Sequence, residues 1–273
     1  MSDPTRIGVA GASGRMGTML IREIVRHNGC VLSGASARGG SAVVGADAGR
    51  VVGLDALNVT ITDRADEMFA AADVVVDFTT PAATVAHAAL ARRHGVALVV
   101  GTTGLDRGQA AALEAAAHEI ALVHAPNMSL GVTLLTALVE RVARALDTDY
   151  DIEILEMHHR RKLDAPSGTA LNLGHAAAKG RGIILDEVAA RGTARDGRTG
   201  VRRVGDIGFG VLRGGDVVGE HTVVFAGAAE RLELTHRAHG REVFARGAVQ
   251  AALWAAGRRP GLYDMTDVLG LKD

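Results

Sequence analysis

The chain has 273 residues, enough for one large domain or two moderate ones, and its 48% hydrophobic content allows a sizeable core. A formal net charge of −1 and only 3% aromatic residues argue against a nucleic-acid surface, which needs a basic field or stacking platforms. The single cysteine, Cys30, excludes an internal disulfide and a cysteine-cluster metal site, and we expect it in the core. The apolar runs are too short for a membrane span and no signal peptide is recognised, so we expect a cytoplasmic protein.

The first strong motif is a glycine-rich turn between a strand and a helix. Residues 6–10 form a short apolar run, and apolar residues recur at helical spacing over 19–25. Between them stand Gly11, Gly14 and Gly17. This pattern differs from the common G-x-G-x-x-G because position 13 is a serine. Such glycines let the backbone approach a pyrophosphate and let the helix pack closely on the strand. The motif therefore indicates a dinucleotide site, whereas the absence of Gly-Lys-Ser/Thr disfavours a P-loop.

The end of the second strand, expected over 31–37, should carry the group that reads the adenosine ribose. An Asp or Glu there would bind the 2′-hydroxyl of NAD, but no acidic residue occurs between Glu23 and Asp47. Arg38 stands in this place, and its guanidinium suits a 2′-phosphate. The sequence thus favours NADP(H), with an ordinary loop arginine as the alternative.

Apolar strands alternate with helices through the first half of the chain. We expect strands at 73–79, 96–100 and 120–124, with helices at 81–94 and 106–117. This α/β pattern predicts a Rossmann-type, doubly wound parallel sheet, in which ligands lie outside the carboxyl ends of the strands. Segments rich in Gly, Thr, Ser or Asn follow four of these strands, at 11–17, 78–80, 101–104 and 125–129.

The second half of the chain predicts an α+β region with a mixed or largely antiparallel sheet covered on one face. We expect a mobile loop over 180–200, rich in Gly, Arg and Asp. Helices are expected at 132–145, 167–179 and 241–256, and strands at 151–157, 203–209, 220–225 and 231–237.

The stretch 156–170 concentrates cationic and proton-donating groups. His158, His159, Arg160, Arg161 and Lys162 are consecutive, and a Ser-Gly-Thr helix start follows them. A helix N-terminus binds anions through its unpaired N–H groups and its dipole. We predict a pocket for a small polyanion with proton donors beside it; the alternative is a solvated loop before a capped helix.

The same stretch resembles the signature of the dihydrodipicolinate reductase family, and the similarity extends over nearly the whole chain. The other matching segments are 9–17, 77–79, 101–104, 125–129, 215–221 and 261–265. The resemblance implies a dinucleotide-binding domain of 1–129 and 240–273 and a substrate-binding and tetramerisation domain of 130–239. It also implies a homotetramer that reduces a small cyclic dicarboxylate with NADPH or NADH in the diaminopimelate/lysine pathway, the two domains closing over both ligands.

By matching positions, the resemblance assigns His158 as acid/base and Lys162 as proton donor. It assigns His159 as a substrate contact and Gly168 and Thr169 as carboxylate-holding positions; the helix start at Ser167 adds further donors. The implied coenzyme contacts are Gly11, Ala12, Ser13, Gly14, Arg15, Met16, Arg38, Gly101, Thr102, Thr103, Ala125, Pro126, Asn127 and Met128. Some members carry an acidic residue where this chain has Ala37, so we expect weaker use of NADH than of NADPH.

Three rival interpretations remain at this point. The chain could be another two-domain dehydrogenase, acting on aspartate-like or homoserine-like substrates, or a non-catalytic NADPH-sensing protein. A metal enzyme using His158 and His159 is the weakest rival, because adjacent residues of an extended chain point to opposite faces. We expect no metal site.

Overall fold

The computed structural model describes residues 3–190, 198 and 200–272. These residues divide into two compact units. Unit 1 takes in the chain up to Leu130 and again from Glu242 onward, and unit 2 runs from Gly131 to Arg241. Unit 1 is therefore made from two separate parts of the sequence.

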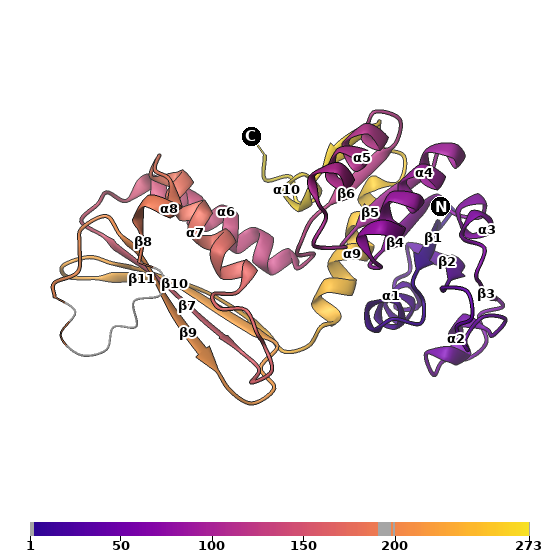
Figure 1. The fold of residues 1–273 in the computed structure, drawn as a ribbon, viewed down its shortest axis with the longest axis horizontal. Coiled ribbons are helices and arrows are strands. Elements are labelled where there is room, and N and C mark those ends of the chain that lie inside the picture. Colours follow the sequence, from indigo (N-terminus) through magenta and orange to yellow (C-terminus); the bar gives the residue numbers. More distant parts are fainter. Residues whose placement is uncertain (1–2, 191–197, 199, 273) are drawn as a thin grey trace. The chain divides into compact units, whose positions relative to one another are not determined.

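The described residues of unit 1 form a seven-stranded sheet in the order β12-β6-β5-β4-β1-β2-β3 (Figure 1). Every neighbouring pair is parallel, which confirms the predicted doubly wound sheet. Its strands are β1 (Thr5–Ala10), β2 (Cys30–Ser36), β3 (Ile61–Thr62), β4 (Val74–Asp77), β5 (Ala97–Val100), β6 (Ala121–His124) and β12 (Gly261–Tyr263). Its helices are α1 (Arg15–Arg26), α2 (Ala48–Val51), α3 (Ala65–Ala70), α4 (Pro81–His94), α5 (Arg107–Ala117), α9 (Glu242–Ala255) and α10 (Met265–Val268).

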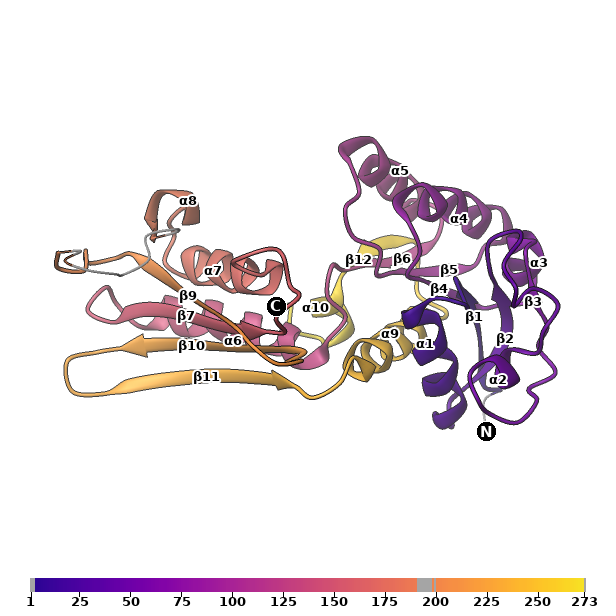
Figure 2. The same cartoon turned by 60° about the horizontal axis from the view of Figure 1, so that its bottom comes forward.

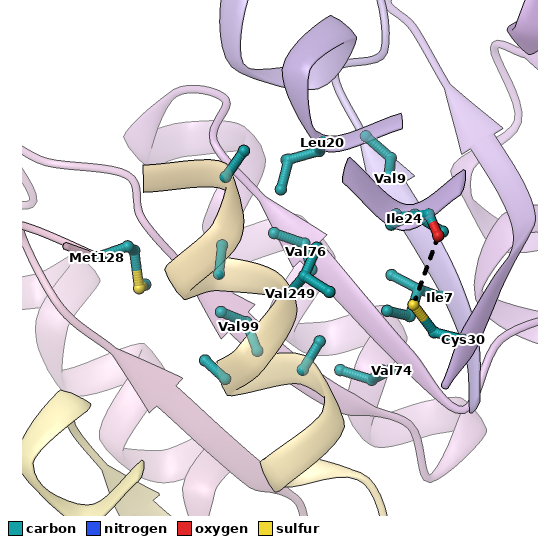
Figure 3. Close-up of a cluster of buried hydrophobic side chains, with 14 of the residues drawn as sticks. Ile7, Val9, Leu20, Ile24, Cys30, Val74, Val76, Val99, Met128 and Val249 are labelled. Carbon is teal, nitrogen blue, oxygen red and sulfur yellow. Dashed lines mark hydrogen bonds between the residues drawn. The ribbon is translucent and has the colours of Figure 1, made fainter. Parts of the chain in front are cut away.

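Helices cover both faces of this sheet, as its continuous apolar strands require. On one face α1 and α9 pack against Val74, Val76 and Val99, and Cys30 is buried there as expected (Figure 3). On the other face α3, α4 and α5 pack against Val75 and alternate residues of the neighbouring strands. Adjacent strand residues thus serve different cores, because side chains alternate across a strand.

Two helices of unit 1 begin where local capping signals place them. Thr80 caps α4 by accepting from the Ala83 N–H, and Pro81 takes the first helical position. Asp106 and Gln109 form a reciprocal capping box at the start of α5. These signals lie within four residues of each helix, which explains why both predicted helices are confirmed to within a residue.

The carboxyl ends of the central strands stand in register along one edge of the sheet. Ala10 pairs with Ser36 on one side and with Asp77 on the other, Asp77 pairs with Val100, and Val100 pairs with His124. The segments that follow these residues therefore lie side by side. They are the segment after β2 and the four polar segments named in the sequence analysis, 11–17, 78–80, 101–104 and 125–129.

Unit 2 contains a five-stranded mixed sheet in the order β11-β10-β7-β9-β8 (Figure 2). Helices α6 and α7 pack on one face of it, over Ile152, Ile154, Val223 and Phe225. This confirms a mixed sheet with one face covered. Its elements are α6 (Leu130–Ala145), β7 (Asp151–His158), α7 (Gly168–Gly180), α8 (Leu185–Val188), β8 (Ala189–Ala190), β9 (Ile207–Arg213), β10 (Gly219–Ala226) and β11 (Arg231–Ala238).

Two expectations for unit 2 need correction. The strand predicted at 203–209 runs instead over β9, where Gly208 and Gly210 pair with Glu153 and Leu155 of β7. Part of the loop expected at 180–200 is ordered as α8 and β8, and residues 191–197 and 199 lie outside the described residues. No helix in the described part of the chain is both long and apolar enough to cross a membrane.

Candidate active site

A pocket of about 450 Å³ lies at the carboxyl edge of the unit 1 sheet. It is formed where β1, β2, β3 and β4 end and where α1 and α4 begin, at the position where doubly wound folds bind dinucleotides. Its lining residues are Gly11, Ser13, Gly14, Ser36, Ala37, Arg38, Asp63, Ala65, Phe78, Thr79, Thr80, Ala83 and His87.

The glycines of the first turn are required by close packing. Gly11 has a φ of +77°, and a Cβ there would lie 2.9 Å from the Thr79 side chain. A Cβ on Gly17 would lie 2.2 Å from the Gly11 carbonyl oxygen, so only glycine lets α1 start this close to the turn. Among the described residues no side chain caps α1 at Gly14. Its first N–H groups therefore suit a phosphate, and the turn fits a dinucleotide.

The predicted coenzyme residues fall into two groups. Gly11, Ser13, Gly14 and Arg38 share the pocket, and Arg15 and Met16 form the first turn of α1. The segments 101–103 and 125–128 follow β5 and β6 at the same edge but do not line the pocket.

Two of these residues, Ala12 and Met128, can contact a ligand only through their backbone atoms. The side chains of Ala12 and Met128 are fully buried in the core of unit 1.

A buried carboxylate, Asp77, fastens the loops around the pocket. It accepts from the Thr79 N–H at 2.8 Å and the Thr79 hydroxyl at 2.6 Å, and its other oxygen lies 2.8 Å from His87 Nδ1. The Thr102 hydroxyl lies 3.1 Å from the Thr79 nitrogen and 2.9 Å from the Thr84 hydroxyl. The Thr102 side chain thus joins the loops after β4 and β5.

The centre of the unit 2 site is a buried carboxylate on β7. Glu156 and His158 are two apart on this strand, so both side chains enter the same face. His158 Nδ1 lies 2.6 Å from Glu156 Oε2, and Arg213 from β9 binds both carboxylate oxygens, at 2.7 and 2.9 Å. The Ser167 N–H also donates to Glu156 Oε1, at 2.9 Å. One carboxylate thus ties together the strand, its neighbour and the start of α7.

These contacts decide the ionisation of the pair. Burial favours the neutral form of Glu156, but the bonds from Arg213, His158 and the Ser167 N–H outweigh it and lower the pKa of the carboxyl. Burial lowers the pKa of His158 although Glu156 opposes this, so the imidazole is neutral near pH 7. An ionised Glu156 accepts the Nδ1 proton, which leaves the lone pair on Nε2.

His221 from β10 completes the buried cluster. Its Nε2 lies 3.1 Å from the Ser167 hydroxyl, and its ring meets that of His158 edge to face at 5.2 Å. Burial, with a smaller effect from His158, lowers the pKa of His221 to about 4. The Ser167 oxygen also caps α7 by accepting a hydrogen bond from the Ala170 N–H.

The loop after β7 carries the remaining predicted residues. Lys162 Nζ lies 2.9 Å from the Asp164 carboxylate, and this contact is the main reason that the pKa of Asp164 is lowered. The His159 N–H donates to the Val217 carbonyl oxygen, and the Lys162 N–H donates to the carbonyl oxygen of His159. Gly168 opens α7, and a Cβ there would meet nothing within 4 Å, so the helix start faces open space.

Sequence reasoning missed Glu156, Arg213 and His221 in this cluster. Glu156 had a usable signal, because its spacing of two from His158 puts both on one face of a strand. Arg213 had none, and His221 stood only as the last residue of the matching segment 215–221, because both reach the site through the pairings His158–Arg213 and Glu156–His221 between distant strands. Asp77 and His87 of unit 1 were missed as well, although Asp77 contacts Thr79 and His87 close to it in the chain. No group of three or more His, Cys, Asp or Glu suited to a metal ion occurs within residues 3–190, 198 and 200–272.

A doubly wound sheet with a glycine-lined pocket, together with a second unit that holds a buried histidine–carboxylate pair, is typical of dinucleotide-dependent oxidoreductases. Family models for the N-terminus and C-terminus of dihydrodipicolinate reductase match residues 5–128 and 131–269. The chain belongs to the dihydrodipicolinate reductase family.

Individual relatives agree with this placement. The chain is 56% identical over 271 residues to a 4-hydroxy-tetrahydrodipicolinate reductase of Dinoroseobacter shibae, covering 99% of this chain and 100% of that one. It is 54% identical over 273 residues to the protein of the same name in Rhodopseudomonas palustris, covering 100% of both. A solved structure of a dipicolinate-bound dihydrodipicolinate reductase from Paenisporosarcina shares the fold, with a TM-score of 0.77 at 23% identity over 97% of this chain and 99% of that one.

Proposed function

We propose that this protein reduces 4-hydroxy-tetrahydrodipicolinate to tetrahydrodipicolinate in the diaminopimelate and lysine pathway, with NADPH as the preferred coenzyme. Substrate and product differ by the 4-hydroxyl group, so the net reaction takes up a hydride and a proton and releases water. The observation that carries the proposal is a buried carboxylate that binds both His158 and the start of α7, with Lys162 on the loop between them, in a chain whose relatives bear the name of this reaction.

The two substrate carboxylates are held by donors at the start of α7. Ser167, Gly168 and Thr169 form this helix start, where the positive end of the helix dipole attracts anions. His159, on the loop after β7, adds a further contact, and the Lys162 ammonium adds positive charge nearby. The proposal rests on the open space at Gly168 and on the cap at Ser167, which orients this helix turn.

Lys162 and His158 share the handling of the proton. The coenzyme, when bound, supplies the hydride, and hydride addition to a conjugated double bond leaves negative charge on a neighbouring atom. The Lys162 ammonium donates the proton and stabilises that charge. His158 acts as the acid/base next to Lys162, through the lone pair on its Nε2. Glu156 is a positioning residue, because it holds the other ring nitrogen of His158, Nδ1.

The coenzyme is held by unit 1. Gly11–Met16 receive the pyrophosphate, and the loops at Gly101–Thr103 and Ala125–Met128 hold the nicotinamide half. Arg38 pairs with the 2′-phosphate of NADPH, which is the basis of the preference. The support is the shared carboxyl edge and the position of Arg38 in the pocket.

We further propose a homotetramer formed through the sheet of unit 2. Leu155 and Leu212 are 41% and 54% exposed on the face opposite α6 and α7, where the Thr222 and Thr235 hydroxyls also pair. Two exposed leucines on a sheet face favour burial against a second copy. Light scattering on the purified protein should give four times the 28.2 kDa chain mass; a monomer mass would contradict this.

One assay tests the reaction directly. Substrate is generated in situ from pyruvate and aspartate semialdehyde, and the loss of reduced-nicotinamide absorbance is followed with NADPH or NADH. We expect loss that depends on both the substrate and this protein, faster with NADPH at subsaturating coenzyme. No loss with either coenzyme would remove the proposed activity, and a clear preference for NADH would remove the role given to Arg38.

A further inference from the structure

The pocket of unit 1 holds two opposite charges on the side that reads the ribose. Arg38 follows the end of β2 and Asp63 follows the end of β3, and both line the pocket. The pairing of Ser36 with Thr62 brings these ends together, and the Ala37 N–H donates to the Thr62 carbonyl oxygen at 2.9 Å. The carboxylate that is absent after β2 is thus supplied by the neighbouring strand.

Neither charge is neutralised by a neighbour. Asp63 and Arg38 are exposed, and within the described residues neither side chain has a hydrogen bond or ion pair. Arg64, the next cation along the chain, is bound to Glu67 at 2.7 Å, so it is not available to neutralise Asp63. Both groups can therefore respond to a ligand in the pocket.

We propose that Asp63 opposes Arg38 in setting coenzyme choice. Its carboxylate accepts hydrogen bonds from the adenosine ribose hydroxyls of NADH and repels the 2′-phosphate of NADPH. A carboxylate is the group that reads the ribose 2′-hydroxyl in dinucleotide folds. A phosphate carries a charge of about −1.5 to −2 near pH 7, so the same carboxylate disfavours it. The inference rests on the proposed function insofar as the pocket takes a nicotinamide dinucleotide.

The test measures coenzyme binding separately from turnover. NADPH and NADH are titrated into the full chain, with the fluorescence of the reduced nicotinamide as the signal, for the unsubstituted protein, Asp63→Asn and Asp63→Ala. Asp55→Asn is the matched control, because Asp55 is also an exposed aspartate of unit 1 but does not line the pocket. Steady-state rates with both coenzymes are measured on the same preparations.

Asp63→Asn removes the charge and keeps an acceptor, so we expect the Kd for NADPH to fall about three- to tenfold, the range for exposed charges near a phosphate. Asp63→Ala removes the acceptor as well, and the Kd for NADH should also rise about threefold. The NADPH effect should shrink as salt is raised, because salt screens exposed charges. Asp55→Asn should change neither constant.

The ratio of the two dissociation constants decides the inference. A ratio within twofold of the unsubstituted value in both Asp63 variants, or an equal shift in Asp55→Asn, overturns the role of Asp63. If both coenzymes bind and the ratio shifts but no substrate is reduced, the proposed reaction fails and the assignment of Asp63 stands. If neither coenzyme binds, both fail.

Discussion

The two proposed binding regions, one in each unit, differ in the kinds of residue that form them. The proposed coenzyme pocket of unit 1 is shaped by glycines and strand ends, and the buried carboxylate of Asp77 holds the neighbouring loops together. The site of unit 2 is built from buried ionisable side chains around Glu156. We infer that unit 1 is sensitive to added volume, whereas unit 2 is sensitive to lost functional groups. Substitutions of each kind can break or sharpen this contrast.

The largest effect should come from removing one of the side chains of unit 2 that we propose to transfer protons. His158→Ala and Lys162→Ala should each lower kcat by a factor on the order of 10²–10⁴, the usual contribution of a general acid or base. The Kd for NADPH, measured by nicotinamide fluorescence, should stay unchanged because unit 1 is untouched. Near-normal turnover in either variant would remove that residue from the mechanism.

Adding one methyl group to the glycine-rich turn of unit 1 should weaken the binding of NADPH. In Gly17→Ala the new Cβ would lie 2.2 Å from the Gly11 carbonyl oxygen, so the turn or α1 must move. Overpacking of this kind costs about 1–3 kcal/mol, and we expect the KM for NADPH to rise about tenfold or more.

The control for Gly17→Ala is Gly108→Ala, where the nearest atom to a Cβ is 3.4 Å away. An unchanged KM in Gly17→Ala, in a protein that still folds, would argue against close backbone approach at this turn.

A methyl group added next to His158 should lower the rate of the proposed reaction. Gly219 on β10 lies beside the His158 ring, and a Cβ there would lie 3.0 Å from Nε2. Because Nε2 carries the lone pair proposed for proton transfer, Gly219→Ala should lower kcat about tenfold while the Kd for coenzyme holds. Gly210→Ala on β9, whose Cβ would make an ordinary 3.5 Å contact, is the control and should leave kcat unchanged. Equal kcat values in both variants would show that the reaction does not depend on open space next to Nε2.

The smallest effect concerns stability against pH. The pKa of His221 is about 4 in the folded chain and about 6.5 when unfolded, so between these values the unfolded chain binds a proton that the folded chain does not. The free energy of unfolding should therefore fall by about 1 kcal/mol from pH 7.5 to 5.5 through this residue. Denaturant melts at both pH values should show a smaller fall in His221→Asn, and an equal fall would assign the effect to other groups.

Local patterns accounted for most of the fold but for less of the site. β4, β5 and β6 were predictable because each is a short continuous apolar run, and α4 and α5 because their caps are local. β12 was not predicted as a strand, and it spans only Gly261–Tyr263. β9 was misplaced because Gly208 and Gly210 have poor strand propensity. At Gly208 a Cβ would lie 2.1 Å from the Glu153 carboxylate, so glycine is needed by packing that only the paired strand reveals.

The same distinction separates the site residues. The glycine turn and the basic loop are contiguous motifs, so their spacing alone identified them. Arg213 and His221 are contributed by different strands, and Asp63 by a third, so each depends on strand pairing. Pairing register is a long-range property, and neither composition nor periodicity carries it.

The discontinuous make-up of unit 1 has a consequence for the order in which the protein is synthesised. When the first 130 residues have left the ribosome, α9 and β12 do not yet exist, because unit 2 is made before them. The sheet face that carries Val74, Val76 and Val99 then lacks α9, one of the two helices that cover it. An exposed apolar face of this kind is where aggregation and chaperone binding begin. A nascent chain stalled before Glu242 is therefore expected to be retained by chaperones until residues 242–273 are added.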